Sequence, residues 1–271
     1  MVRAFLTDLD GCAIDAADPK GIRAGQALAM LRARGWAVGI VTSRTAAEVA
    51  QLWSLWDLRP PAVVESGGAL LLGDLPDGAL RSRAMPTAFG PVVPLGAAAD
   101  DLWESMRDAV EARADVRRFR QLSDAELSEV LGLPTEDLAR ARDRRWSEPL
   151  VVGGPRESRT LLGAEFERLG LHAADGGKLL HVLRGSDKGR GAAELLTALG
   201  SAPGAAGSVG VGDAPGDVSF LQIVASAFVI RAEGKPHFPA MLAALPRAHL
   251  VAEPGSAGWR RVVAALAAAA D

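Results

Sequence analysis

Two aspartates end an apolar run near the start of the chain, and this stretch constrains the fold more than any other. The run from Val2 to Leu6 predicts a buried β-strand, and Asp8 and Asp10 follow it before Gly11. Alternate residues of a strand share a face, so both carboxylates point the same way. Neighbouring carboxylates repel unless a cation or a proton lies between them, and Mg²⁺ suits such a pair together with phosphate oxygens. The simpler alternative is an acidic corner between a strand and a loop.

The segments after this strand alternate between helical and strand patterns. Ile22 to Arg34 has apolar residues at helical spacing, and Ala37 to Val41 is a short apolar run typical of a buried strand. Thr45 and Glu48 have the spacing of a capping box, which predicts the start of a second helix. Ala62 to Glu65 then predicts a third strand. The order β-α-β-α-β indicates an α/β fold with a parallel sheet and crossover helices.

The pattern changes in the middle of the chain. Residues 70–85 predict a hairpin, and residues 100–169 mix amphipathic helices with a strand, which is typical of an α+β unit. From Lys178 the α/β alternation resumes, with strands expected at 179–183, 208–211, 227–230 and 249–251. We therefore expect a core domain in two parts, 1–80 and 177–271, with a smaller inserted domain over 81–176.

Composition excludes several classes of partner. The chain has 271 residues, 49% hydrophobic and 23% charged, a net charge of −3 and no basic stripe, which argues against nucleic acid. Its longest apolar tract, Val262 to Ala270, is too short to span a bilayer, which argues against a membrane. A single cysteine, Cys12, and the absence of a signal-peptide pattern predict a cytoplasmic location. Oligomeric state is left open.

Four short segments carry polar residues at strand ends or helix starts, where an open α/β sheet places its ligands. The residues are Asp8 with Asp10, Thr42, Lys188, and Asp213 with Asp217. A carboxylate can act as a nucleophile and carry a phosphoryl group, while a hydroxyl, an ammonium and Mg²⁺ can offset or hold phosphate oxygens. The simpler alternatives are an exposed lysine, two helix-capping aspartates and an ordinary strand end. We expect these side chains to meet around one ion-and-phosphate pocket.

The order of these motifs, D-x-D-G, then Thr, then Lys, then G-D-x-x-x-D, resembles the haloacid dehalogenase (HAD) superfamily of phosphotransferases. The middle block lies between Thr42 and Lys188, where members with a large C2 cap (subclass IIB) carry it. The resemblance implies an α/β fold, a Rossmann-like parallel-sheet core with an inserted α+β (C2-type) cap domain. More narrowly, the chain is similar to the mannosyl-3-phosphoglycerate phosphatase family at 42–49, 65–69, 146–149, 176–181 and 187–189.

This resemblance implies a Mg²⁺-dependent phosphatase that forms mannosylglycerate and phosphate through an aspartyl-phosphate. Asp8 is then the nucleophile, and Asp10 protonates the leaving alcohol and later activates water. Asp8, the backbone carbonyl of Asp10 and Asp213 hold Mg²⁺, with support from Asp217. Phosphate is held by Thr42, Ser43 and Lys188.

Three positions depart from the pattern of the family. Cys12 stands where the superfamily usually has Thr, and we expect a small buried residue there. Ser66 replaces Asn, and Arg44 stands where relatives often have Lys. None of these changes removes a residue of the four polar segments described above.

The sugar-glycerate end of the substrate needs further contacts, because a carboxylate favours a bidentate arginine partner. The candidates are Arg44, Arg142, Arg145, Lys178 and His181. For the arginines at 142, 144 and 145 the alternative is a solvated helix face. His172, His237 and His249 lack metal-ligand spacing, and we expect surface or packing positions for them.

Other functions remain open at this stage. Glucosyl-3-phosphoglycerate differs from the mannosyl compound at one hydroxyl, and a broader range of sugar phosphates is also compatible with the motifs. A phosphosugar mutase uses the same pair of aspartates but keeps the phosphate on the sugar. A non-catalytic phosphate-binding module is disfavoured, because all four motifs retain their reactive side chains.

Overall fold

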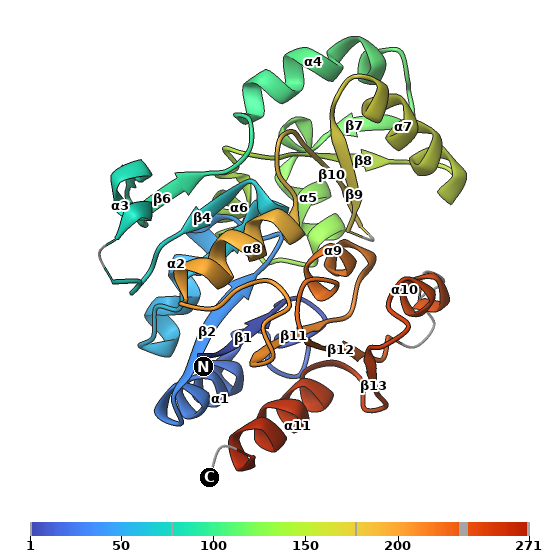
Figure 1. Cartoon of the computed structure of the whole chain (residues 1–271). Helices are drawn as coiled ribbons and strands as arrows, with labels where there is room; N and C mark the ends of the chain where they lie inside the picture. The colour runs from blue at the N-terminus through green and yellow to red at the C-terminus, as the bar shows by residue number, and fades with distance from the viewer. Residues whose placement is uncertain (1, 77, 177, 233–237, 270–271) are drawn as a thin grey trace.

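A computed structural model describes residues 2–76, 78–176, 178–232 and 238–269. The chain forms a nine-stranded sheet in the order β13-β12-β11-β1-β2-β3-β4-β6-β5 and a four-stranded sheet in the order β7-β8-β10-β9 (Figure 1). In the large sheet, the strands from β13 to β3 pair in parallel, and β4, β6 and β5 pair antiparallel. This mixed α/β architecture confirms the predicted fold class.

The parallel strands are β1 (Arg3–Thr7), β2 (Trp36–Val41), β3 (Ala62–Val64), β11 (Ser208–Gly212), β12 (Ser226–Ile230) and β13 (His249–Val251). The helices beside them are α1 (Ile22–Ala33), α2 (Ala46–Trp56), α8 (Lys188–Ala198), α9 (Val218–Leu221), α10 (Phe238–Ala244) and α11 (Gly255–Ala268). The capping box predicted at Thr45 is present, with its hydroxyl and the Glu48 carboxylate each accepting a backbone N–H.

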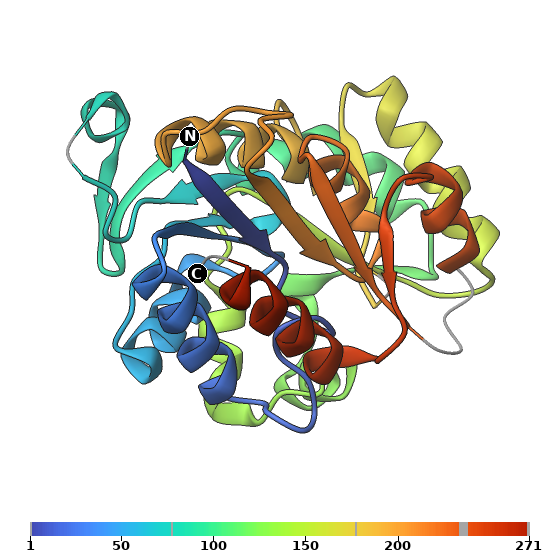
Figure 2. The ribbon, with the colours of Figure 1, turned by 60° about the horizontal axis from the view of Figure 1, so that its bottom comes forward.

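Helices cover both faces of this sheet, which explains why its strands are apolar throughout. On β1, Phe5 packs in the cluster that includes α1, α2 and α11, while Ala4 and Leu6 pack against α8, α9 and α10 on the other face. Figure 2 shows the blue helix α1 and the red helix α11 on one side of the sheet, with the orange helix α8 on the other. Trp53 and Trp56 of α2 are buried in the first cluster, as predicted.

The second sheet carries its own helices. Its strands are β7 (Val116–Arg118), β8 (Glu148–Val152), β9 (His172–Asp175) and β10 (Leu180–Leu183), all paired antiparallel. The helices of this part are α4 (Ala99–Glu111), α5 (Asp124–Leu131), α6 (Thr135–Arg142) and α7 (Arg156–Arg168). Two apolar clusters, one with α4 and α7 and one with α5 and α6, hold it together. This part has the composition of the predicted α+β unit.

Two predictions about strands are wrong. Residues 70–85 do not form a hairpin: β4 (Ala69–Leu71) pairs with β6 (Gly90–Pro94), and the intervening chain forms α3 (Ala79–Arg83) and β5 (Met85–Thr87). The strand at 180–183, expected in the core, is β10 of the second sheet. A short apolar run fits either sheet, and only long-range pairing decides between them.

These pairings bear on the expected division of the chain into 1–80, 81–176 and 177–271. Residues 85–94 pair with the large sheet, and residues 180–183 pair with the small one. We propose that the inserted cap runs from α4 to β10, with the core on either side of it. In the described part of the chain, every helix is too short or too polar to cross a lipid bilayer.

Candidate active site

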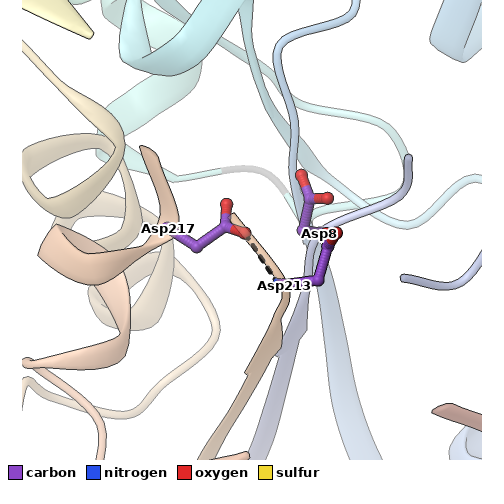
Figure 3. A group of neighbouring side chains, drawn as sticks. All are labelled: Asp8, Asp213 and Asp217. Atoms are coloured by element: carbon purple, nitrogen blue, oxygen red, sulfur yellow. Dashed lines mark hydrogen bonds between the residues drawn. The ribbon is translucent and has the colours of Figure 1, made fainter. Parts of the chain in front are cut away.

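Three buried carboxylates meet at the carboxyl ends of β1 and β11. These strands pair in parallel, with Thr7 opposite Val211, so Asp8 and Asp213 leave the sheet side by side. Asp217 approaches from the turn before α9 (Figure 3). Carboxylate oxygens of the three aspartates lie within 4.8 Å of one another, and all three residues are at least 95% buried. Three buried acids this close need positive charge between or beside them.

Lys188 supplies part of that charge. It is the first residue of α8, and its buried Nζ donates to Asp8 Oδ1 at 2.8 Å and to Asp217 Oδ1 at 2.6 Å. Burial by itself lowers the pKa of Lys188, but the two carboxylates outweigh it and raise the pKa above its usual value. For Asp8, burial and then the Asp217 carboxylate raise the pKa, and Lys188 opposes them. One ammonium among three carboxylates leaves the cluster negative.

The cluster therefore suits a hard divalent cation. Its donors are carboxylate oxygens, which Mg²⁺ favours. Space is kept beside Asp213 by Gly11, since a Cβ at that position would lie only 2.6 Å from Asp213 Oδ2. Gly11 also has a φ of +81°, which side chains rarely adopt. The residues present fit a metal ion on both chemical and steric grounds.

Asp217 orders the loop as well as the lysine. Its Oδ2 accepts the backbone N–H groups of Asp213 and Ala214, each at 3.0 Å, and the first of these bonds is drawn in Figure 3. One carboxylate therefore fixes both the Lys188 ammonium and the loop that carries Asp213. Its position fits a supporting residue of the metal site.

Asp10 stands apart from the three-carboxylate cluster. Its side chain is 51% exposed, and its carboxylate accepts hydrogen bonds from Nε of Arg44 at 2.9 Å and from Nη2 of Arg44 at 2.6 Å. The surrounding protein raises the pKa of Asp10, but the charge and hydrogen bonds of Arg44, followed by the charge of Lys188, lower it below its usual range. The Asp10 carboxylate is therefore ionised and held by Arg44 in this conformation.

The loop after β2 carries the predicted phosphate-binding residues. Thr42 is fully buried, and its Oγ1 accepts the backbone N–H of Arg44 at 3.2 Å, which leaves its own hydroxyl proton to donate. Ser43 lines a cavity of about 340 Å³ together with Asp8, Asp10 and Lys188. The cavity lies between the core and β9 of the second sheet, so the cap closes over the acidic cluster.

The substrate candidates of the cap separate into two groups. Arg142 donates to Asp124 at 2.8 Å and Arg145 to Asp143 at 3.1 Å, and neither lines a cavity described for this chain. Lys178, His181 and Arg44, in contrast, all line a second and larger cavity. The candidates at 142 and 145 are therefore not placed for substrate contact in this conformation.

One buried residue of the site, Glu65, was missed from the sequence, and another, Arg144, was weighed with Arg142 and Arg145 but not chosen among the substrate candidates. Arg144 lines the larger cavity, although its neighbours at 142 and 145 turn away from it. Glu65 ties the core to the cap, because its fully buried carboxylate accepts the backbone N–H groups of Arg145 and Trp146 and the Ser147 hydroxyl. The signal available for both was their position in or next to segments 65–69 and 146–149, which carried the resemblance.

Cys12 and Ser66, two of the residues that depart from the family pattern, lie in a buried core position and in a tight turn. Burial and then the Asp8 charge raise the pKa of the Cys12 thiol, which is therefore protonated and packed in the core. Ser66 has a φ of 60° in a tight turn after β3. The next residue, Gly67, has a φ of +109°, and a Cβ there would lie 2.1 Å from the Asp187 backbone, so this turn requires glycine.

Two of the three histidines expected at surface or packing positions lie in the described residues, and neither belongs to a cluster of metal ligands found there. His172 is exposed on β9, and His249 is exposed on β13 with its ring stacked on Phe228. His237 lies outside the described residues.

Comparisons with known proteins found relatives and similar structures, although no protein-family model matches the chain. The chain is 25% identical over 270 residues to the glucosyl-3-phosphoglycerate/mannosyl-3-phosphoglycerate phosphatase of Persephonella marina, covering 96% of this chain and 95% of that one. It is also 25% identical over 236 residues to the mannosyl-3-phosphoglycerate phosphatase of Pyrococcus furiosus, covering 85% and 91%.

Solved structures share the fold. The sucrose-phosphatase of Synechocystis, solved with sucrose and phosphate, has a TM-score of 0.65 at 14% identity over 98% of both chains. A sugar phosphatase of HAD subclass IIB has a TM-score of 0.66 at 14% identity, covering 97% of this chain and 98% of that one.

In sequence the chain is similar to phosphatases, which are phosphoric monoester hydrolases, and in fold it is similar to a sugar phosphatase of HAD subclass IIB. Within that class its resemblance is to the mannosyl-3-phosphoglycerate phosphatases, which confirms the resemblance predicted from sequence.

Proposed function

We propose that the protein is a Mg²⁺-dependent phosphatase that hydrolyses mannosyl-3-phosphoglycerate to mannosylglycerate and inorganic phosphate. The observation that carries this proposal is the contact of Lys188 Nζ with Asp8 Oδ1, 2.8 Å apart, inside a buried cluster of three carboxylates. A carboxylate fixed in this way beside a cation can attack a phosphoryl group that would otherwise repel it. The two relatives named for this activity support the choice of substrate.

The reaction proceeds in two half-reactions. Asp10 first leaves Arg44 and takes up a proton from water. The Asp8 carboxylate then attacks phosphorus, and the bond from phosphorus to the glycerate oxygen breaks while the protonated Asp10 gives that oxygen its proton. Water then attacks the aspartyl-phosphate, Asp10 takes the proton, and phosphate leaves with Asp8 restored. Asp10 lines both cavities, which supports this role, and it exchanges its Arg44 partner to reach the leaving oxygen.

Asp8, the backbone carbonyl of Asp10 and Asp213 would hold Mg²⁺, and Asp217 would keep the loop of Asp213 in place. When bound, the ion offsets negative charge on the nucleophile and the phosphoryl group. Phosphate oxygens are bound by Thr42, Ser43 and Lys188. Lys178, His181 and Arg44 line the larger cavity, which supports the proposal that the rest of the substrate extends there.

Glucosyl-3-phosphoglycerate is the second candidate substrate, because the Persephonella marina relative carries both names. Phosphate release by the purified protein decides between them when both compounds are compared with common hexose phosphates, each with Mg²⁺ and with a chelator. We expect the glycosyl-phosphoglycerates to be hydrolysed far better than the hexose phosphates, and only with the metal. Equal or better activity on hexose phosphates would refute the narrow substrate claim.

A further inference from the structure

The larger cavity adjoins the smaller one and is lined by side chains of both charges. Its volume is about 900 Å³, and Asp10, Ser43 and His181 line both this cavity and the smaller one, so the two are contiguous. The cations that line it are Arg44, Arg144, Arg159 and Lys178. Carboxylates of the same lining, those of Asp10, Asp15, Glu48 and Asp175, balance these cations in number. The informative question is therefore which single cation has no carboxylate paired with it.

Three of the four cations are already engaged. Arg44 is paired with Asp10 through two nitrogens, and Arg159 is paired with Asp175 at 3.0 Å. Lys178 donates to a backbone carbonyl at the end of α5 at 2.9 Å, and its side chain is accessible to solvent. None of these cations is both buried and without an accepting oxygen.

Arg144 differs from all three. It is only 6% exposed, and its Nη1 donates to the Ser43 carbonyl at 3.0 Å and to Ser147 Oγ at 3.4 Å. Its Nε is buried without a partner, and among the described residues Nη2 donates to none and no carboxylate forms an ion pair with the guanidinium. The charge of the buried Glu65 carboxylate acts on the guanidinium, but that carboxylate is already occupied by three other donors. The guanidinium also lies over the Phe119 ring, 5.3 Å from its centroid. The guanidinium therefore keeps Nη2 without an acceptor among the described residues, and an anion from outside the chain can supply one.

His181 lines both cavities, feels the charges of both Arg144 and Lys188, and provides a second, independent sign of a ligand. It is 5% exposed, and its Nδ1 is buried without a partner. Burial, followed by the charges of Arg144 and Lys188, lowers the pKa of His181 to about 3, so the imidazole is neutral near pH 7. A neutral imidazole can bond to an uncharged hydroxyl or ether oxygen that joins two anionic groups.

We propose that Arg144 binds the carboxylate of the glycerate and so requires the substrate to carry a second anionic group beside its phosphate. This inference rests on the proposed function. Arg144 is fixed to the carbonyl of Ser43, the neighbour of Thr42, so an anion on its free edge lies close to the phosphate loop. In a 3-phosphoglycerate the carboxylate and the phosphate stand at the two ends of a three-carbon unit, which suits adjacent subsites. The remaining space of the larger cavity accommodates the sugar.

Arg144→Met tests this assignment, with Arg145→Met as a matched control whose side chain points to Asp143. We expect kcat/KM for mannosyl-3-phosphoglycerate to fall about 10- to 100-fold more than kcat/KM for mannose 6-phosphate, the loss typical of a charged hydrogen-bonding pair. Arg144→Lys should recover part of the wild-type preference in kcat/KM for mannosyl-3-phosphoglycerate over mannose 6-phosphate. Arg145→Met should keep that preference in full. An equal loss on both substrates would show a structural role and overturn the inference.

A second measurement does not depend on the variant's folding or on the sugar. With wild-type protein and p-nitrophenyl phosphate, D-glycerate should inhibit competitively far more strongly than glycerol, which lacks the carboxylate. Inhibition by glycerate no stronger than by glycerol would overturn the inference even if the phosphoglycerates prove to be substrates. Conversely, if the wild type prefers hexose phosphates, the proposed function fails, while selective inhibition by glycerate that Arg144→Met removes would still support the subsite.

Discussion

Replacing His181 with glutamine should reduce the loss of stability that the protein suffers on mild acidification. The buried imidazole has a pKa of about 3 in the folded protein, against about 6.5 in an unfolded chain. Because the pKa of the His181 imidazole is lower in the folded protein than in the unfolded chain, the unfolded chain takes up this proton at a higher pH. The contribution of His181 to stability is therefore complete above pH 6.5 and falls as pH drops from there towards 3.

The size of this effect follows from the two pKa values. Protonation stabilises the unfolded chain by about 1.4 kcal/mol at pH 5.5 and by about 0.2 kcal/mol at pH 7, because the folded protein takes up almost no proton at either pH. Wild type should therefore lose about 1.2 kcal/mol more than His181→Gln between these pH values. Carboxylates elsewhere in the protein titrate in both variants and cancel in the comparison.

Urea unfolding at pH 7 and at pH 5.5 measures the difference, with linear extrapolation to water. His172→Gln, a change of an exposed histidine on β9, is the matched control and should behave as wild type. If wild type and His181→Gln lose the same stability on acidification, the imidazole is charged in the folded protein. It would then not be the neutral group inferred between the phosphate and carboxylate subsites.

Three further changes test other parts of the site. Asp8→Asn should lower phosphatase activity by on the order of 10⁴-fold or more with native circular dichroism, and retained activity would point to another nucleophile. Mg²⁺ at about 100 times its Kd should stabilise the wild-type protein by about 2.7 kcal/mol in urea unfolding, and Asp213→Asn should abolish this stabilisation. Equal stabilisation of wild type and Asp213→Asn would place the ion elsewhere. Glu65→Gln should cost about 1–3 kcal/mol by weakening the bonds to Arg145, Trp146 and Ser147, and an unchanged urea midpoint would contradict that role.

The local signals in the sequence predicted most of the core. The apolar run before Asp8 forms a buried strand, and the Thr45 capping box begins α2, because both depend on residues close together in the chain. Parallel pairing of β1 with β11 then places Asp8 beside Asp213, as the position of both at strand ends suggested. The hairpin at 70–85 and the place of residues 180–183 were wrong, because short strands take the sheet that long-range packing offers them.

The direction of individual side chains in the cap could not be obtained in this way. Arg142, Arg144 and Arg145 are chemically alike and adjacent, and no periodicity distinguishes them. The buried Glu65 carboxylate fixes the backbone at 145 and 146, and Ser43 and Ser147 hold the guanidinium of Arg144. All of these partners except Ser147 are about 80 to 100 positions away in the chain, as the separations of the bonded pairs show.

The sequence by itself determined the chemistry that is available: two aspartates after a strand, a lysine at a helix start, a second acidic motif, and the order in which they occur. Only the tertiary structure decided that Lys188 lies between Asp8 and Asp217, that Asp10 is held by Arg44, and that one arginine of three faces the cavity. The physical reason is that residue types and strand ends follow from local sequence, whereas the pairing of buried charges is settled by which distant segments share the space between core and cap.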